Sequence, residues 1–206
     1  MLRISLKEVI VIVLICLIAG CSKNDPIPFD ASYFPLHVGD FREYAYHSFH
    51  GYVRSVNTEI TGKVDVDGKS YYVMRQTYFY HDAQSPPRHD TVYYRVGNNG
   101  FVYSLYAYDK REVNEFRLGA APGEKWKIKI TQDQTAWMSA SFDAEHPFGN
   151  NTLQNCKIFS FDIPLAVDDE TTTVLAPGLG MISRSNPEAG SISLRRATIN
   201  GVTYEF

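Results

Sequence analysis

From residue 33 onward, large apolar residues alternate with polar ones over short stretches, and turn-forming residues separate these stretches. In one such stretch, Trp126, Ile128 and Ile130 alternate with Lys125, Lys127 and Lys129. A period of two residues is typical of a β-strand that has one face in a core and the other in water. No long stretch after residue 33 has a clear helical period, so the fold is predicted to be all-β.

Pairs of turn-forming residues divide this region into candidate strands. Asp67-Gly68 and Asn200-Gly201 are typical of two-residue hairpin turns, because these residue types tolerate positive φ. The pattern predicts one domain with a single antiparallel, strongly curved sheet, or a half-open barrel or sandwich, of about ten or more strands. The candidate strands are residues 41–49, 53–66, 69–81, 91–96, 101–108, 112–118, 125–131, 136–142, 155–163, 170–175, 180–185, 191–199 and 202–206.

The first residues have the pattern of a bacterial export signal. Arg3 and Lys7 form a positive region ahead of an apolar run, residues 9–18, that is too short to span a bilayer. The run leads into Leu17-Ile18-Ala19-Gly20-Cys21, which resembles the lipobox of bacterial lipoproteins. This resemblance implies a helical signal segment that is cleaved before Cys21, and diacylation of the Cys21 sulfur. The expected organisation is a signal peptide at 1–20, a lipidated tether at 21–32 and an all-β domain at 33–206.

The tether indicates where the domain is held. Pro26 and Pro28 oppose helix formation, and the segment is short, so the domain is expected to lie close to a membrane. Ser22, rather than an aspartate, follows Cys21. By resemblance to the sorting rule of well-studied Gram-negative bacteria, this implies the outer membrane. The lipid-anchored domain would then face the periplasm or the cell surface.

Charge and cysteine content exclude some classes of function. The formal net charge is −3 and no basic stripe is visible, so nucleic acid is not an expected partner. Of the three cysteines, Cys16 lies in the signal and Cys21 is the expected lipid anchor. Only Cys156 is left, so no intrachain disulfide is expected, and Cys156 is predicted to be a buried packing residue.

Three further segments resemble a family. They are Phe34-Pro35-Leu36-His37-Val38-Gly39, Asn155-Cys156 and Ala176-Pro177-Gly178-Leu179-Gly180. Together with the lipobox they are similar to a family of uncharacterised bacterial outer-membrane lipoproteins, which share an F-P-L-x-V-G opening and a C-terminal A-P-G-x-G turn. The resemblance implies an antiparallel, curved β-domain. It carries over no catalytic residue.

Candidate catalytic and metal-binding patterns are weak. His81-Asp82 and His89-Asp90 flank a loop and would offer four nitrogen and oxygen ligands to zinc if both pairs lay at one hairpin mouth. The alternative interpretation is a polar loop, and no metal or cofactor is predicted. No G-x-S-x-G elbow occurs, and Cys156 has no neighbouring basic motif. The chain is therefore predicted not to be an enzyme, although carboxylates from distant strands could still meet.

The tyrosines are the best candidates for ligand contact. Tyrosine offers a large contact area and a polar tip at low rotamer entropy, although it is also a common strand residue. The predicted function is a non-enzymatic, membrane-anchored binding or structural module of the cell envelope, with a glycan, peptide or lipid ligand. One alternative is a lipid or lipoprotein carrier with a concave apolar groove, and another is an envelope hydrolase. The predicted ligand-binding residues are Tyr78, Tyr80, Tyr106 and Tyr108, within a wider set that includes Tyr44, Tyr46, Tyr72 and Tyr94.

Overall fold

The computed structural model describes residues 28–47, 52–106, 110–130, 134–164, 166 and 170–206. These residues form one short 3₁₀ turn, η1 (Ala31–Tyr33), and no α-helix. The strands are β1 (Phe41–His47), β2 (Val53–Val66), β3 (Lys69–Tyr80), β4 (Arg88–Val96), β5 (Phe101–Tyr106), β6 (Arg111–Arg117), β7 (Lys125–Lys129), β8 (Thr135–Phe148), β9 (Asn151–Asp162), β10 (Thr171–Ala176), β11 (Gly180–Asn186), β12 (Gly190–Ile199) and β13 (Val202–Glu205).

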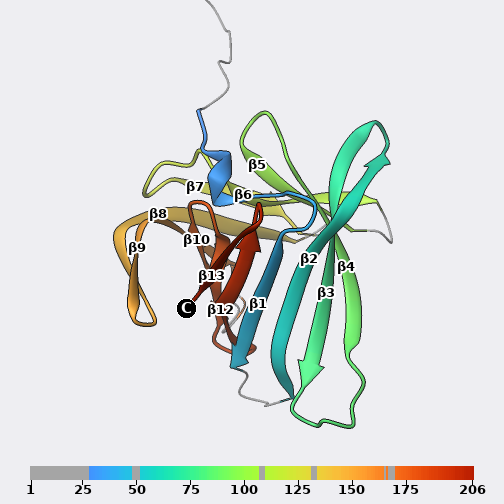
Figure 1. The fold of residues 1–206 in the computed structure, drawn as a ribbon. Helices are drawn as coiled ribbons and strands as arrows, with labels where there is room; N and C mark the ends of the chain where they lie inside the picture. Colours follow the sequence, from blue (N-terminus) through green and yellow to red (C-terminus); the bar gives the residue numbers. More distant parts are fainter. Residues whose placement is uncertain (1–27, 48–51, 107–109, 131–133, 165, 167–169) are drawn as a thin grey trace, which may run out of the picture.

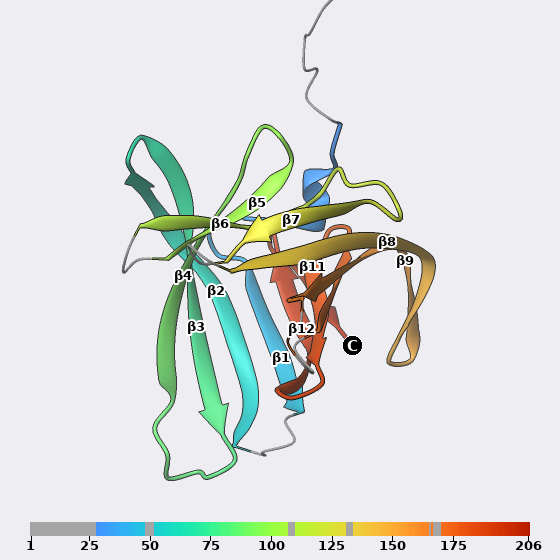
Figure 2. The ribbon, with the colours of Figure 1, turned by 180° about the vertical axis from the view of Figure 1, so that it is seen from behind.

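All strands belong to one 13-stranded antiparallel sheet with the order β6-β5-β4-β3-β2-β1-β12-β11-β10-β9-β8-β7, and β13 pairs with β12. Neighbours in the sheet are neighbours in the chain, except where β1 meets β12. The sheet curves strongly, so that β5 to β8 cross the upper ends of β1 to β4 (Figures 1 and 2). Its two ends, β6 and β7, contact each other but do not pair. The all-β, curved and half-open prediction is confirmed.

Most strand boundaries lie close to the predicted ones, but β8 and β9 are a clear exception. Alternation predicts strands at 136–142 and 155–163, whereas β8 reaches Phe148 and β9 starts at Asn151. The added residues pair with each other across a tight turn and are mostly exposed or half-buried. Backbone pairing rather than a buried face forms this part of the hairpin, so alternation does not reveal it. Asn155-Cys156 therefore lies within β9, not at its head.

The core has two large parts. One cluster gathers side chains of β5 to β10 with Tyr33, including Phe116, Phe159 and Leu175. The other is built around β9 to β12 and includes Cys156 and Val174. Since the neighbours Val174 and Leu175 belong to different clusters, both faces of β10 are covered.

Arg42, on β1, connects two distant segments: the F-P-L-x-V-G opening and the A-P-G-x-G turn. Its side chain is only 4% exposed. Nε donates to the Leu179 carbonyl at 2.9 Å, and one terminal nitrogen donates to the Pro35 carbonyl at 3.1 Å. Gly180 has a φ of +83°, and a Cβ there would lie 3.3 Å from both Arg42 and Pro35. Only glycine suits this conformation and this close approach.

Asp40 adds a second connection at the same end of the sheet. Its buried carboxylate accepts hydrogen bonds from the backbone N–H of His37 at 3.1 Å and of Asn200 at 2.8 Å. The opening segment is thereby joined to the turn between β12 and β13. Two distant parts of the chain thus meet beside β1.

Residues 28–32, the end of the predicted tether, lie against the domain. Phe29 packs on the cluster that contains Phe116. Asp30 caps η1 by accepting from the Ser32 N–H at 2.9 Å. Tyr33, which follows, donates from its hydroxyl to the Asn155 carbonyl at 2.5 Å. The chain is therefore attached to the sheet before β1 begins.

A charged network links β3, β4 and β6. The Glu112 carboxylate accepts from Arg95 Nε at 2.5 Å, from the Tyr71 hydroxyl at 2.6 Å and from Lys69. Partial burial alone would raise the pKa of Glu112, but these hydrogen bonds outweigh burial and lower the pKa to about 2. The ionised form of Glu112 therefore stabilises the folded state.

We expect Arg42→Ala to lower the free energy of unfolding by about 3 kcal/mol or more, because two buried carbonyls lose their donor. Urea denaturation monitored by tryptophan fluorescence measures this. The matched control is Arg75→Ala, which removes an exposed ion pair with Glu59 and should cost less than about 1 kcal/mol. Equal stability of the two variants would contradict the role assigned to Arg42.

Glu112 should make stability depend on pH in acid. Its pKa is lowered on folding, so its contribution is fully present above its ordinary value of 4.5 and is lost as the pH falls toward about 2. The contribution is on the order of 2 kcal/mol. Urea denaturation between pH 7 and pH 2 should show a flatter acid slope for Glu112→Gln than for the wild type. Glu59→Gln, at an exposed ion pair, should leave the slope unchanged.

Candidate functional site: a cavity on the concave face

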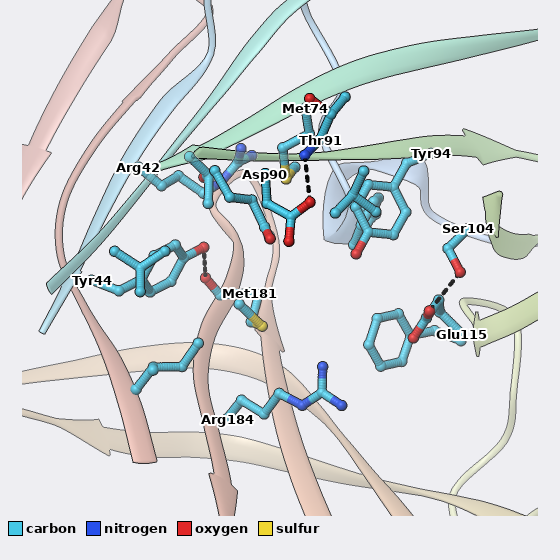
Figure 3. Close-up of a pocket in the computed structure, with 18 of the residues that line it drawn as sticks. Arg42, Tyr44, Met74, Asp90, Thr91, Tyr94, Ser104, Glu115, Met181 and Arg184 are labelled. Atoms are coloured by element: carbon cyan, nitrogen blue, oxygen red, sulfur yellow. Dashed lines mark hydrogen bonds between the residues drawn. The ribbon is translucent and has the colours of Figure 1, made fainter. Parts of the chain in front are cut away.

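The concave face of the sheet holds a cavity of about 680 Å³. Strands β1 to β6, β11 and β12 contribute to its wall, together with Phe34 and Pro35 from the opening segment. Figure 3 shows these side chains converging on a common space. Such a volume is within the range of sites that bind small molecules, about 300–1,000 Å³.

The pairing register explains why many of these side chains share the face. Thr58 on β2 pairs with Gln76 on β3, and Gln76 pairs with Asp90 on β4. Directly paired residues point to the same side of a sheet, so all three face the cavity. Arg75, between the inward Met74 and Gln76, faces the other side and forms an exposed ion pair.

Two β-bulges bring in further residues. On β6, Phe116 pairs with Val102 and Asn114 with Tyr103, so Glu115 is an extra residue and lines the cavity beside Phe116. On β11 the register shifts in the same way at Ile182. Met181 and Arg184, which a regular strand would place on opposite faces, consequently both line the cavity.

Five tyrosines form much of the aromatic wall: Tyr44, Tyr46, Tyr78, Tyr94 and Tyr106. The Tyr44 hydroxyl donates to the Met181 carbonyl at 3.0 Å, and burial raises the pKa of Tyr44 to about 12. Burial, with Glu115 nearby, also raises the pKa of Tyr94. Both phenols therefore stay neutral at physiological pH and can donate hydrogen bonds.

The predicted tyrosine cluster is only partly assembled in the described residues. Tyr78 and Tyr106 line the same cavity, and Tyr106 is 50% exposed. Tyr80 is half-buried and lies two residues beyond Tyr78 along β3, outside the cavity wall. Tyr108 lies outside the described residues. Tyr44, Tyr46 and Tyr94, from the wider set of candidates, contribute where Tyr80 does not.

Polar groups without protein partners also face the cavity. Among the described residues, neither the Arg184 guanidinium nor the Tyr94 hydroxyl has a hydrogen-bond or ion-pair partner. The Thr58 hydroxyl is buried and also lacks a hydrogen bond. Glu115 is more constrained, because its carboxylate accepts from the Ser104 hydroxyl at 2.7 Å. The sequence alone does not single out these polar groups, since each is a single polar residue in a strand.

A second cavity of about 220 Å³ adjoins the first. Its wall combines apolar residues, Ile128, Met138 and Phe159 among them, with the polar residues Asn114, Thr171 and Thr173. Glu115 and Arg184 line both cavities. The two charged side chains therefore lie where the two cavities meet.

The His-Asp pairs do not form a metal centre in the structure. Strand β4 begins at Arg88, so His89 and Asp90 lie within the strand rather than at a hairpin mouth. His89 is 3.1 Å from the Thr77 hydroxyl, whereas Asp82 accepts from Gln84 and Ser85 in the loop. In the part of the chain that is described, no three metal-ligating side chains gather in one place.

Cys156 is fully buried, as the sequence predicts. Burial raises the pKa of its thiol to about 11, with a further contribution from Asp143. The thiolate is the reactive form of cysteine, so this residue is suited to packing rather than to nucleophilic attack.

Across the described ranges, no helix has both the length and the apolar character needed to cross a membrane.

Comparisons with known proteins identify no relative by sequence: no family model and no curated protein matches the chain. Two solved structures are similar in shape. One is a protein from Bacteroides fragilis, provisionally described as exported and as having a YmcC-like fold, with a TM-score of 0.48, 10% identity and coverage of 84% of this chain and 98% of that one. The other, from Parabacteroides distasonis, is provisionally described as a lipoprotein and has a TM-score of 0.41 with the same identity and coverage. At this level of similarity, neither match bears on function.

Proposed function

We propose that the protein is a lipid-anchored component of the bacterial cell envelope that binds a small ligand in the 680 Å³ cavity and does not transform it. The lipobox that ends at Cys21 supports the anchor and the envelope location, and Ser22 directly after it supports the outer membrane. The cavity supports the binding role. The ligand class consistent with a wall of aromatic rings and scattered polar groups is an amphiphile.

The observation that carries the binding role is the set of polar groups without protein partners. An unsatisfied buried polar group costs about 1–3 kcal/mol, and proteins rarely leave one without a reason. Here the buried Thr58 hydroxyl lines the cavity together with the half-buried Tyr94 and the exposed Arg184, and among the described residues none of the three has a hydrogen-bond partner. A ligand that hydrogen-bonds to Thr58 would satisfy the buried group, and Tyr94 and Arg184 could bind its polar end.

The polar residues of the wall also distinguish between two kinds of carrier, one for a bare acyl chain and one for a ligand with a polar end. A groove for an acyl chain alone would be apolar throughout, because desolvating polar groups against hydrocarbon is unfavourable. Charged residues from three strands, Asp90, Glu115 and Arg184, instead reach this cavity. We therefore favour a ligand with a polar end over a bare hydrocarbon chain.

The hydrolase alternative has one specific observation in its favour. Asp90 and Glu115 line the same cavity, and a pair of carboxylates is what glycoside hydrolysis requires. Each carboxylate already accepts a hydrogen bond, Asp90 from the Thr91 N–H at 2.9 Å and Glu115 from Ser104. We assign them to ligand binding, and the protein should release no product from nitrophenyl glycosides or esters. Hydrolysis that is abolished by Asp90→Asn or Glu115→Gln would overturn this assignment.

Binding in the cavity can be tested with anilinonaphthalene sulfonate, an amphiphilic dye that fluoresces in apolar sites. The sample is the chain from residue 21 onward with Cys21→Ser, which removes the anchor and keeps every described residue. Tyr78→Ala combined with Tyr106→Ala should weaken dye binding by about tenfold, or 1.4 kcal/mol, and lower the melting temperature by only a few degrees.

The matched control for this double variant is Tyr52→Ala combined with Tyr204→Ala. Both residues are exposed and neither lines the cavity. Dye affinity should therefore remain at the wild-type value. If both double variants bind the dye equally well, the cavity is not the binding site.

The anchor is tested separately in cells. Cys21→Ala should abolish incorporation of labelled palmitate and leave the signal uncleaved, because the sulfur is the acylation site that the lipobox implies. Cys156→Ala is the matched control and should be labelled like the wild type. Labelling of Cys21→Ala, with retention in membranes after a carbonate wash, would show that the lipobox interpretation is wrong.

A further inference from the structure

Glu115 and Arg184 carry opposite charges and face the same space without pairing. Both line the large and the small cavity, yet they form no ion pair with each other. In Figure 3 the Arg184 guanidinium extends into the cavity from β11, and the Glu115 carboxylate faces it from β6. Opposite charges that share a cavity and remain apart leave room for a ligand between them.

Tyr94 lies within the influence of both charges. The charge of Glu115 raises its pKa and that of Arg184 lowers it, while burial has the largest effect. Its hydroxyl has no hydrogen-bond partner among the described residues. A neutral phenol in this position can donate to an anion or accept from a cation, so it complements either end of a bound dipole.

One side of the small cavity can hold an apolar group. Ile128, Met138 and Phe159 form that side, while Asn114, Thr171 and Thr173 add polar atoms elsewhere in the wall. A ligand held between the two charges would place an attached hydrocarbon group there. Each methylene that leaves water for an apolar cavity strengthens binding, so the affinity should rise with chain length.

We propose that the ligand is a zwitterionic amphiphile, whose acidic group binds Arg184, whose ammonium group binds Glu115 and whose apolar chain enters the small cavity. This rests on the binding role proposed above and specifies the ligand class. A purely anionic amphiphile would meet the Glu115 carboxylate, and a purely cationic one would meet Arg184. Each would leave one charge of the site unpaired.

Two chemical sources offer this combination of groups, and they can be distinguished. One is a free α-amino acid, in which the acid is a carboxylate. The other is a phosphoethanolamine headgroup, in which the acid is a phosphate. The probes are therefore 2-aminodecanoate and decyl phosphoethanolamine, compared with decanoate, decylamine and decanol, which have similar chains and different charges.

Isothermal titration calorimetry on the Cys21→Ser chain should rank at least one zwitterion about tenfold above decanoate, decylamine and decanol. The zwitterion that binds more tightly identifies the source. 2-Aminobutanoate, with the same charges and a short side chain, should bind far more weakly than 2-aminodecanoate if the carboxylate form is preferred. The same chain-length comparison applies to ethyl and decyl phosphoethanolamine.

Charge-removing variants then assign each end of the ligand. Arg184→Gln should lower the affinity for the preferred zwitterion by about tenfold and leave the affinity for decylamine unchanged or higher. Glu115→Gln should lower the affinity for the same zwitterion and leave the affinity for decanoate unchanged or higher. Glutamine keeps an oxygen that can accept from Ser104, so this variant should remain folded. Arg75→Gln, on the opposite face of the sheet, is the matched control and should bind like the wild type.

The outcomes separate this inference from the proposed function. If all the decyl probes bind equally, or if only anilinonaphthalene sulfonate binds, the zwitterion inference is wrong and the cavity is still a binding site. If Arg184→Gln and Glu115→Gln leave the preference for the zwitterion intact, the assigned contacts are wrong and the inference is overturned. If neither the dye nor any decyl probe binds, the proposed function itself fails.

Discussion

The fold depends on joining its first strand to a late one, and Arg42 is central to that junction. A buried guanidinium is costly unless its donors are satisfied, and here two of them bind carbonyls from opposite ends of the chain, Pro35 and Leu179. The β1–β12 pairing next to it is the only place in the described sheet where strand neighbours are distant in sequence. Without this junction the strands would form two separate meanders, and no concave face would unite β4 with β11.

How much of the fold is predictable depends on whether an interaction is local. Asp67-Gly68 and Asn200-Gly201 adopt positive φ at both residues, so the hairpins that they predict form as expected. The contact between Arg42 and Leu179 spans 137 residues, and no pattern within a strand indicates it. The segments of the family resemblance provide a partial signal, because two of them, the opening and the A-P-G-x-G turn, prove to be packed against Arg42.

The site is less predictable than the fold because its key residues break the alternation. Tyr78 and Tyr106 can be found from their residue type and from the excess of aromatic residues. Glu115 sits next to the inward Phe116, so a regular strand would direct it outward, and only the bulge brings it into the cavity. In the same way, the bulge at Ile182 brings Met181 and Arg184, which a regular strand would place on opposite faces, to the same cavity. Each bulge interrupts the regular pairing, and these two bring Glu115 and Arg184 into the cavity wall beside Phe116 and Met181.

Because the two ends of the sheet, β6 and β7, do not pair, the interior can change its width there when a ligand binds. Between all other neighbouring strands of the described sheet, widening the interior would break backbone hydrogen bonds. Between β6 and β7 the described residues form no such ladder. Glu115 lies on one side of this join and Ile128 on the other, and both line the small cavity. Within the described sheet, the interior can therefore widen without breaking strand pairing only between β6 and β7. The small cavity, where we propose that the hydrocarbon chain binds, lies at this junction.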